Sequence, residues 1–341
     1  QQDLISLAGG LPAPEAFPVQ DLIEISAEVL RTEGASALQY AATEGLPSLR
    51  CAVAERNNLL WGTEHSAEEV LITTGSQQAL DLVGKLLLDD GDEVLCESPT
   101  YIGAISAWNI HRPRWIEVPC DDYGMVPEAL ERCLAEARRA KMIYVVPNFQ
   151  NPSGRTWSME RRAALMSVAE PRGLAVIEDN PYGEVRFEGE HLPSLRTLDR
   201  SDQVISLGTF SKIFCPGLRL GWITAARPIV EKLSLVKQGA DLHSPTFNQM
   251  MAARYLERVD FASRIGEIIE LYRPRRDAMA AALTELVPSA SFTHPQGGLF
   301  LWVTLPETID ARALLETWRG GSPLCRGRGS SPTVAAVIIC G

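Results

Sequence analysis

Short apolar runs alternate with helix-like segments through the middle of this chain, and this alternation limits the possible folds more than any other feature. The runs that we interpret as strands span residues 70–73, 93–96, 141–146, 174–178, 204–207 and 220–224. Helix signals lie between them at residues 76–88, 127–140 and 158–171. Strands that alternate with helices form a mainly parallel sheet covered by helices. The sequence therefore predicts an α/β fold.

The pattern changes from about residue 230 onward. A long helical stretch runs through residue 256 and past residue 272, and a Pro-Gln-Gly-Gly turn at 295–298 leads into a predicted strand at 299–304. We predict residues 1–42 as an N-terminal arm and part of a small domain, 43–260 as the large domain, and 261–341 as the C-terminal small domain. Residues 318–341 are atypical because no amphipathic helix can be drawn through them, and we expect a truncated or altered segment there.

Charge and composition argue against several kinds of partner. The chain has 32 Lys and Arg against 43 Asp and Glu, a formal net charge of −11, which repels nucleic acid and anionic lipid. No run approaches the roughly 20 apolar residues that span a bilayer, and no signal pattern opens the sequence. The seven cysteines never occur in C-x-x-C spacing, and the five histidines form no local ligand motif. We expect a cytoplasmic protein with no metal, membrane or nucleic acid partner.

One lysine follows a predicted strand in a setting that favours a nucleophile. Lys212 ends the run Ser-Leu-Gly-Thr-Phe-Ser-Lys, and strand ends in an open α/β sheet face the ligand crevice. An isolated lysine is more often a solvated surface charge, but apolar residues precede and follow this one. Desolvation lowers the pKa of an amine, and the neutral amine is the form that attacks an aldehyde.

An acidic residue ends another predicted strand. Asp179 lies in Val-Ile-Glu-Asp-Asn-Pro-Tyr, where a helix cap is the plainer interpretation when the segment is taken alone. Together with Lys212 it suggests a second role, that of a cofactor ligand. A carboxylate opposite the pyridine nitrogen of pyridoxal phosphate keeps that nitrogen protonated. Tyr182, three residues on, can donate to the phenolic oxygen of the same cofactor.

Four further residues fit a phosphate pocket. Ser76 follows a strand and a glycine at the start of a predicted helix, and helix N-termini bind phosphate through free amide donors; a simple Ser N-cap is the alternative. Arg219 offers a planar, always charged donor group, with Thr209 and Ser211 as hydroxyl neighbours. Tyr101 ends another strand and can stack on an aromatic ring, with a buried core tyrosine as its alternative.

Together these segments resemble the class I/II aminotransferases, which are fold-type-I pyridoxal-phosphate enzymes. Five motifs occur in the order typical of that family: S-L-A-G-G-L-P, T-T-G-S-Q-Q-A-L, P-N-F-Q-N-P-S-G, E-D-N-P-Y, and G-T-F-S-K followed by P-G-L-R-L-G. The resemblance covers about residues 5–306. It is strongest to the subgroup of 2-aminoadipate aminotransferase, kynurenine aminotransferase II and the aminotransferase-like domain of MocR regulators. It implies a seven-stranded, mainly parallel sheet in the large domain and a smaller α+β domain.

The resemblance also implies roles for the residues around the cofactor ring. Lys212 would hold pyridoxal 5'-phosphate covalently as an internal aldimine, and Asp179 would pair with the ring nitrogen. Asn151 and Tyr182 would contact the phenolic oxygen, while Tyr101 would stack on the ring. Lys212, Asp179 and Tyr182 are the expected catalytic residues.

Other positions follow from the same resemblance. The expected phosphate-binding residues are Ser76, Gln77, Thr209, Ser211 and Arg219. Tyr40 matches a tyrosine that reaches the phosphate of the neighbouring subunit, which implies a homodimer with shared active sites. Gly10 matches a loop near the substrate carboxylate, where Asn151 would also contribute.

The implied reaction is a ping-pong transfer of an amino group from an α-amino acid to a 2-oxo acid such as 2-oxoglutarate. The donor side chain would be aromatic, branched-chain or 2-aminoadipate-like. Another fold-type-I activity, a decarboxylase or β-lyase, remains an alternative because Lys212 and Asp179 serve those reactions equally well. A sensor domain of a MocR-type regulator is a second alternative, although we see no helix-turn-helix module in the sequence.

One expected residue has no clear counterpart. The family carries an arginine near its C-terminus, in a strand, that binds the substrate α-carboxylate through two parallel hydrogen bonds. After Trp302 the arginines are Arg312, Arg319, Arg326 and Arg328, and none sits in a matching strand. We therefore hypothesise that the chain binds the cofactor but transaminates poorly, which a comparison with a variant carrying a family-like C-terminal segment would test.

Overall fold

The computed structural model describes residues 9–311 and the backbone of residues 335–339. The helices are α1 (Val19–Ala37), α2 (Pro47–Trp61), α3 (Ser76–Leu87), α4 (Ile102–Trp108), α5 (Pro127–Glu136), α6 (Met159–Ala169), α7 (Arg227–Ala240), α8 (Thr246–Arg258) and α9 (Phe261–Leu286). The strands of the large sheet are β1 (Val70–Thr73), β2 (Glu93–Ser98), β3 (Arg114–Asp121), β4 (Gly124–Met125), β5 (Ala140–Val145), β6 (Ala175–Asp179), β7 (Val204–Thr209) and β8 (Gly221–Thr224). A second sheet contains β9 (Ser291–Phe292), β10 (Phe300–Thr304) and β11 (Ala335–Ile339).

The large sheet has the strand order β1-β8-β7-β6-β5-β2-β3-β4. Strands β7, β6, β5, β2 and β3 run parallel, whereas β8 is antiparallel to both β1 and β7. The predicted α/β class and mainly parallel sheet are confirmed. The expected number of seven strands is one too few, because the two-residue β4 pairs with the end of β3.

Strand β3 was not among the predicted strands, and its position explains why. It lies near the edge of the sheet, so several of its side chains are exposed, including Arg114 and Glu117. It also contains Pro119, which cannot donate to a strand ladder and is therefore confined to edges and strand ends. These residues hide the apolar pattern that identifies a buried central strand.

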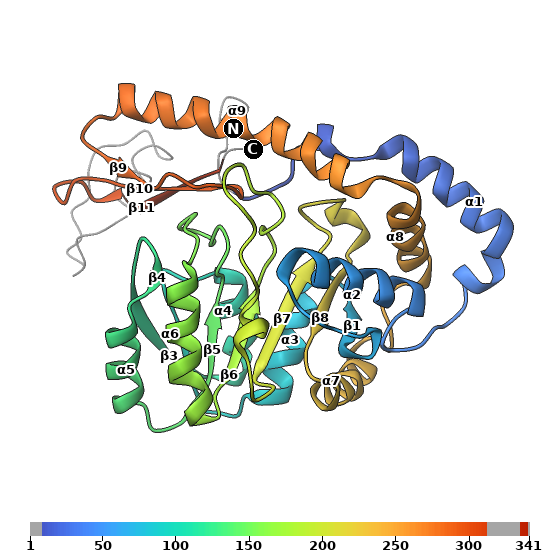
Figure 1. The fold of residues 1–341 in the computed structure, drawn as a ribbon, viewed down its shortest axis with the longest axis horizontal. Coiled ribbons are helices and arrows are strands. Elements are labelled where there is room, and N and C mark those ends of the chain that lie inside the picture. The colour runs from blue at the N-terminus through green and yellow to red at the C-terminus, as the bar shows by residue number, and fades with distance from the viewer. Residues whose placement is uncertain (1–8, 312–334, 340–341) are drawn as a thin grey trace, which may run out of the picture.

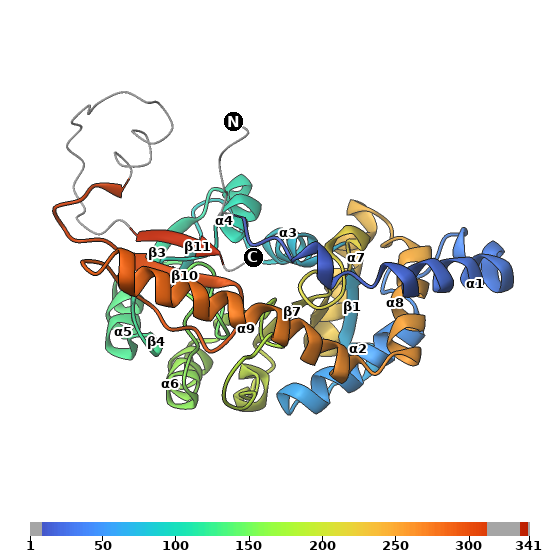
Figure 2. The ribbon, with the colours of Figure 1, turned by 90° about the horizontal axis from the view of Figure 1, so that it is seen from above.

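Helices cover both faces of the large sheet (Figure 2). On one face, α3, α4 and α7 bury residues such as Leu80, Trp108 and Leu233 against the strands. On the other face, α5 and α6 bury Leu130 and Leu165. Because most of these strands are covered on both sides, their sequences read as continuous apolar runs, and this made them easy to predict.

The second half of the chain contains three helices where a single long helical stretch was predicted. A turn at residues 241–245 separates α7 from α8, and α9 starts after Asp260, whose side chain caps the backbone N–H of Ser263. Helix α1 lies along α8, and α9 lies over the three-stranded sheet and extends toward α8 (Figure 1). The atypical C-terminal segment includes β11, which pairs antiparallel with β10.

The described residues contain no helix long and apolar enough to cross a membrane. The proposed division of the chain at residues 42 and 260 stays a prediction.

The sheet core can be tested with two leucines of opposite exposure. Leu71 in β1 is completely buried, whereas Leu59 in α2 is 82% exposed. Leu71→Ala should lower the free energy of unfolding by about 2–5 kcal/mol because it leaves a cavity between sheet and helices. Leu59→Ala should change it by less than about 0.5 kcal/mol. Urea unfolding followed by circular dichroism measures both values, and equal losses would contradict this assignment of the core.

Candidate active site

A cavity of about 340 Å³ opens at the edge of the sheet where β6 and β7 end. This is the edge at which an open α/β sheet binds its ligand. Ten predicted site residues line the cavity: Ser76, Gln77, Tyr101, Asn151, Asp179, Tyr182, Thr209, Ser211, Lys212 and Arg219. They come from segments as distant as residues 76 and 219, and the convergence of strand ends brings them together.

Lys212 lies three residues beyond the end of β7. Its Nζ donates a hydrogen bond of 2.7 Å to the carbonyl oxygen of Gly10 and lies 5.7 Å from the ring centroid of Tyr182. Burial and the positive charge of Arg219 lower the pKa of Lys212 to about 8. A substantial fraction of the amine is therefore neutral near physiological pH, as a nucleophile toward an aldehyde requires.

Asp179 is the last residue of β6 and is only 2% exposed. Its Oδ2 accepts a hydrogen bond of 2.8 Å from the hydroxyl of Tyr144, whereas its buried Oδ1 has no hydrogen-bond partner among the described residues. Burial raises the pKa of Asp179 to about 7. A buried carboxylate with one unpaired oxygen at a cavity wall fits a protonated ring nitrogen, because buried polar atoms normally have a partner.

Tyr144 is a site residue that sequence reasoning missed. It is the next-to-last residue of β5, is completely buried and donates a hydrogen bond to Asp179. In the sequence it looks like any aromatic residue of a core strand. Only the adjacency of β5 and β6 in the sheet could have revealed its contact.

Tyr182 and Asn151 form a second pair on the cavity wall. The side-chain amide of Asn151 donates to the hydroxyl of Tyr182 over 3.2 Å. Burial raises the pKa of Tyr182, so its phenol stays protonated and can donate a hydrogen bond of its own. The pair thus presents one amide and one hydroxyl toward Lys212.

Arg219 lies against the turn that precedes α3. A Cβ atom on Gly75 would come within 2.5 Å of Nη2 of Arg219, and Gly75 has a φ of +80°, so only glycine fits this position. Thr209 and Ser211 are joined by a hydrogen bond of 2.9 Å between their hydroxyls. The helix N-terminus, the guanidinium and the hydroxyls are groups that favour anions, and all of them line this cavity.

Gln77 and Tyr101 meet at the cavity rim. The side-chain amide of Gln77 donates to the carbonyl oxygen of Gly103 over 2.9 Å, so this side chain is turned toward α4. The group of Gln77 that can bind an anion is therefore its backbone N–H. A Cβ atom on Gly103 would overlap the ring of Tyr101, which shows how closely the ring packs against α4. The position of Tyr101 on the cavity wall agrees with stacking on a ring.

Tyr40 lies apart from this cavity. Its side chain is 78% exposed and packs edge-on against His243 at 5.7 Å between ring centroids. Gly10, in contrast, is buried, and its carbonyl oxygen contacts Lys212. The four candidate carboxylate arginines, Arg312, Arg319, Arg326 and Arg328, lie outside the described residues, so the hypothesis of a missing arginine stays a prediction.

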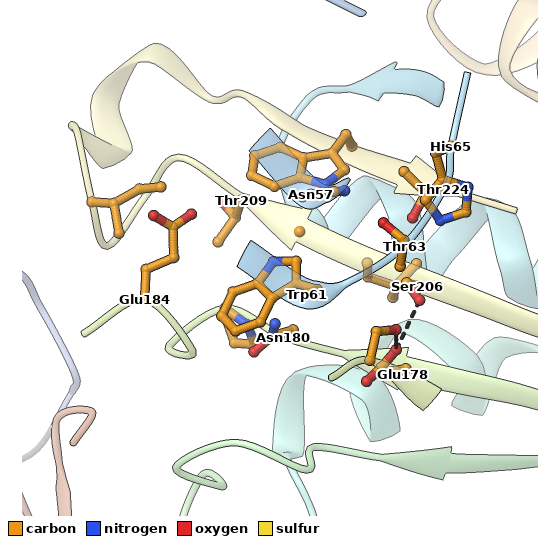
Figure 3. A pocket seen from close by; sticks show the side chains of 16 residues that line it. Asn57, Trp61, Thr63, His65, Glu178, Asn180, Glu184, Ser206, Thr209 and Thr224 are labelled. Carbon is orange, nitrogen blue, oxygen red and sulfur yellow. Dashed lines mark hydrogen bonds between the residues drawn. The ribbon is translucent and has the colours of Figure 1, made fainter. Parts of the chain in front are cut away.

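A second, polar cavity lies between the end of α2 and strands β6 and β7 (Figure 3). It is lined by His65, Ser206 and Thr224 among others, and Glu178 accepts a hydrogen bond of 2.9 Å from Ser206. Its volume of about 30 Å³ has room for one or two water molecules. The larger cavity is therefore the candidate active site.

The shifted pKa of Lys212 predicts a pH-dependent stability. In the unfolded chain this amine has its ordinary pKa of 10.5, against about 8 in the folded protein. Burying the charged amine therefore destabilises the folded protein. This penalty is complete below pH 8, where the amine is protonated in both states, and it disappears between pH 8 and 10.5, where folding releases the proton.

Cofactor-free Lys212→Met should accordingly be about 2 kcal/mol more stable than the wild type at pH 7. The advantage should shrink between pH 8 and 10.5. Urea unfolding across this range measures it, and the same substitution at the exposed Lys232 controls for the loss of a surface charge. A constant difference at every pH would contradict the prediction.

Comparison with known proteins identifies the family of this chain. The family model for aminotransferase class I and II matches residues 2–329. Aromatic-amino-acid aminotransferase 1 of Thermococcus litoralis is 44% identical over 319 residues, which cover 92% of this chain and 76% of the relative. The 2-aminoadipate transaminase of Thermus thermophilus is also 44% identical, over 91% of this chain and 77% of its own length.

Solved structures show the same fold. The crystal structure of the Pyrococcus horikoshii kynurenine aminotransferase superimposes with a TM-score of 0.88 at 42% identity, covering 92% of this chain and 79% of that one. The predicted resemblance is confirmed. The chain belongs to the class I and II aminotransferases and is a pyridoxal-phosphate-dependent transaminase.

Proposed function

We propose that the chain transfers the amino group of an α-amino acid with an aromatic, branched-chain or 2-aminoadipate-like side chain to a 2-oxo acid such as 2-oxoglutarate. One observation carries the proposal: a partly neutral Lys212 and an Asp179 whose Oδ1 has no partner among the described residues line the same cavity. The similar proteins named for aromatic amino acids and 2-aminoadipate support this choice of donors.

The residues that line the cavity suit pyridoxal phosphate. Asp179 would hold the ring nitrogen, and the start of α3 with Arg219 would hold the phosphate, in the cavity that Lys212 also lines. When bound, the cofactor supplies an electron sink that stabilises the negative charge left by loss of the Cα proton. Tyr101 would stack on the ring.

Lys212 has two tasks in this proposal. Its Nζ would hold the cofactor covalently and, as a general base, would take the proton from the substrate Cα. The pKa of about 8 suits both tasks because the amine can lose and regain a proton near neutral pH. The carbonyl oxygen of Gly10 orients the amine by accepting its hydrogen bond.

Tyr182 and Asn151 complete the proposed catalytic group. The protonated phenol of Tyr182 would donate to the phenolic oxygen of the cofactor, and Asn151 holds that phenol in place through its own hydrogen bond. Thr209 and Ser211 would add hydroxyl contacts to the phosphate. A cytoplasmic location is also part of the proposal.

We further propose that the chain acts as a homodimer in which Tyr40 reaches the phosphate of the partner subunit. Two neighbouring apolar side chains support this: Leu38 is 76% exposed and Tyr40 is 78% exposed. They border a surface hollow lined by residues of the α1 end and the start of α8. Exposed large apolar side chains that gather at one place are typical of protein interfaces.

The catalytic assignment is tested with Lys212→Ala. This variant should lose the visible absorbance of lysine-linked cofactor, and its turnover should fall by roughly 10⁴-fold or more, because both attachment and proton transfer depend on Nζ. Lys232→Ala, on the exposed side of α7, should leave both properties unchanged. The wild type is screened with aromatic, branched-chain and 2-aminoadipate donors against 2-oxoglutarate.

Two outcomes would contradict this proposal. If Lys212→Ala keeps the absorbance, another residue holds the cofactor. If donors lose carbon dioxide or their β-substituent without forming pyridoxamine phosphate, the chain is a decarboxylase or β-lyase.

The dimer is tested with Tyr40→Phe. Analytical ultracentrifugation should give twice the chain mass for both wild type and variant, since the ring remains. The dissociation constant of the cofactor should rise about tenfold in the variant, because one hydrogen bond to a charged phosphate is lost. A monomeric wild type, or an unchanged cofactor affinity, would argue against this role of Tyr40.

A further inference from the structure

An ion pair between a buried lysine and a partly exposed aspartate lies beside the start of α3, and neither partner lines the cavity. Lys237, in the last turn of α7, is completely buried, and its Nζ donates a hydrogen bond of 2.5 Å to Oδ1 of Asp241. The other carboxylate oxygen, Oδ2, accepts two hydrogen bonds, from the side-chain amide of Gln78 over 2.6 Å and from the hydroxyl of Thr74 over 2.9 Å. Asp241 thus joins α7 to the residues around the start of α3.

The two residues that Asp241 holds flank the proposed phosphate-binding turn. Thr74 precedes Gly75, and Gln78 follows Ser76 and Gln77. The side-chain oxygen of Gln78 also accepts a hydrogen bond of 2.7 Å from the backbone N–H of Thr74. A closed ring of hydrogen bonds therefore surrounds the turn on the side away from the cavity.

This arrangement is hard to explain by stability alone. Removing the ammonium of Lys237 from water costs more than its ion pair with the partly exposed Asp241 returns, because burial lowers the pKa of Lys237 in spite of that pair. A ring of directional bonds fixes the positions of atoms instead. The backbone N–H groups at the start of α3 bind an anion only if they converge on one point, and small movements of the turn would separate them.

The same segment also reaches Tyr40. The hydroxyl of Ser244 lies 2.9 Å from that of Thr74, and the hydroxyl of Thr246 donates to the carbonyl oxygen of Gln39 over 3.0 Å. His243, between them, packs against the ring of Tyr40. Residues 241–246 therefore contact both the turn that would bind this subunit's phosphate and the tyrosine that would reach the partner's.

We propose that Asp241 is a positioning residue for the cofactor phosphate: held by Lys237, it fixes Thr74 and Gln78 so that the first N–H groups of α3 converge on the phosphate. The same segment holds Tyr40 in place for the neighbouring site. This inference rests on the proposed function, since it requires that the phosphate binds at the start of α3.

The experiment compares two ligands that differ only in the phosphate. Cofactor-free protein is titrated with pyridoxal phosphate and with pyridoxal, and the formation of the lysine-linked species is followed by absorbance. In Gln78→Met, which keeps a good helix former but breaks both hydrogen bonds of the amide, the affinity for pyridoxal phosphate should fall about tenfold. The affinity for pyridoxal should not change.

A second variant removes the ion pair without leaving a buried charge. The double substitution Lys237→Met with Asp241→Asn should give the same selective loss for pyridoxal phosphate. Glu231→Gln, on the exposed side of α7, is the matched control and should behave like the wild type. Turnover at saturating cofactor should stay close to the wild-type value in both test variants, because the reacting atoms are untouched.

Each other outcome overturns a specific claim. Equal weakening of both ligands in the two test variants would mean that the network supports only the fold, and unchanged affinities would mean that it does not position the turn. A wild type that binds pyridoxal as tightly as pyridoxal phosphate would instead disprove the phosphate site itself. The failure of the proposed function is thus distinguished from the failure of this inference.

Discussion

The structure depends on the burial of a mainly parallel sheet between two layers of helices. Covering both faces of β5, β6 and β7 removes their apolar side chains from water, which supplies most of the driving force for folding. Because these strands run parallel, their carboxyl ends meet at one edge. Strands β2, β5, β6 and β7 deliver residues at or after their ends to the same cavity, and this is how Asp179 and Lys212 come together.

The same burial also shifts the pKa values of Lys212 and Asp179. Loss of water around Lys212 destabilises its charged form, and Arg219 adds to this effect. The pKa of Asp179 is shifted in the opposite direction because burial disfavours its anion, and the hydrogen bond from Tyr144 offsets this only in part. A cation placed at the unpaired Oδ1 would favour the ionised carboxylate again. The unpaired Oδ1 of Asp179 and the lowered pKa of Lys212 therefore suit a cofactor that has a basic ring nitrogen and an aldehyde.

The sequence predicted the central elements well and the peripheral ones poorly. Strands β1 and β5 to β8 were found within one or two residues because their apolar runs are unbroken. Strand β3 was missed since its exposed edge carries charges and a proline, and α7 to α9 were merged because the turns between them lack a glycine stop signal. The C-terminal strand β11 was not predicted, since its partner β10 identifies it as a strand and a single segment cannot show pairing.

The sequence by itself determined which chemical groups this protein has and, through its motifs, the family to which it belongs. The local sequence pattern is enough to show which polar residues lie at or near the ends of predicted strands. These are lysine, aspartate, arginine and hydroxyl residues. Only the tertiary structure decided which groups meet. The bond from Tyr144 to Asp179, the contact of Gly10 with Lys212 and the ring around Thr74 and Gln78 join residues that are far apart in the chain. Hydrogen bonds depend on distances of a few tenths of an ångström, and packing of the whole fold sets those distances.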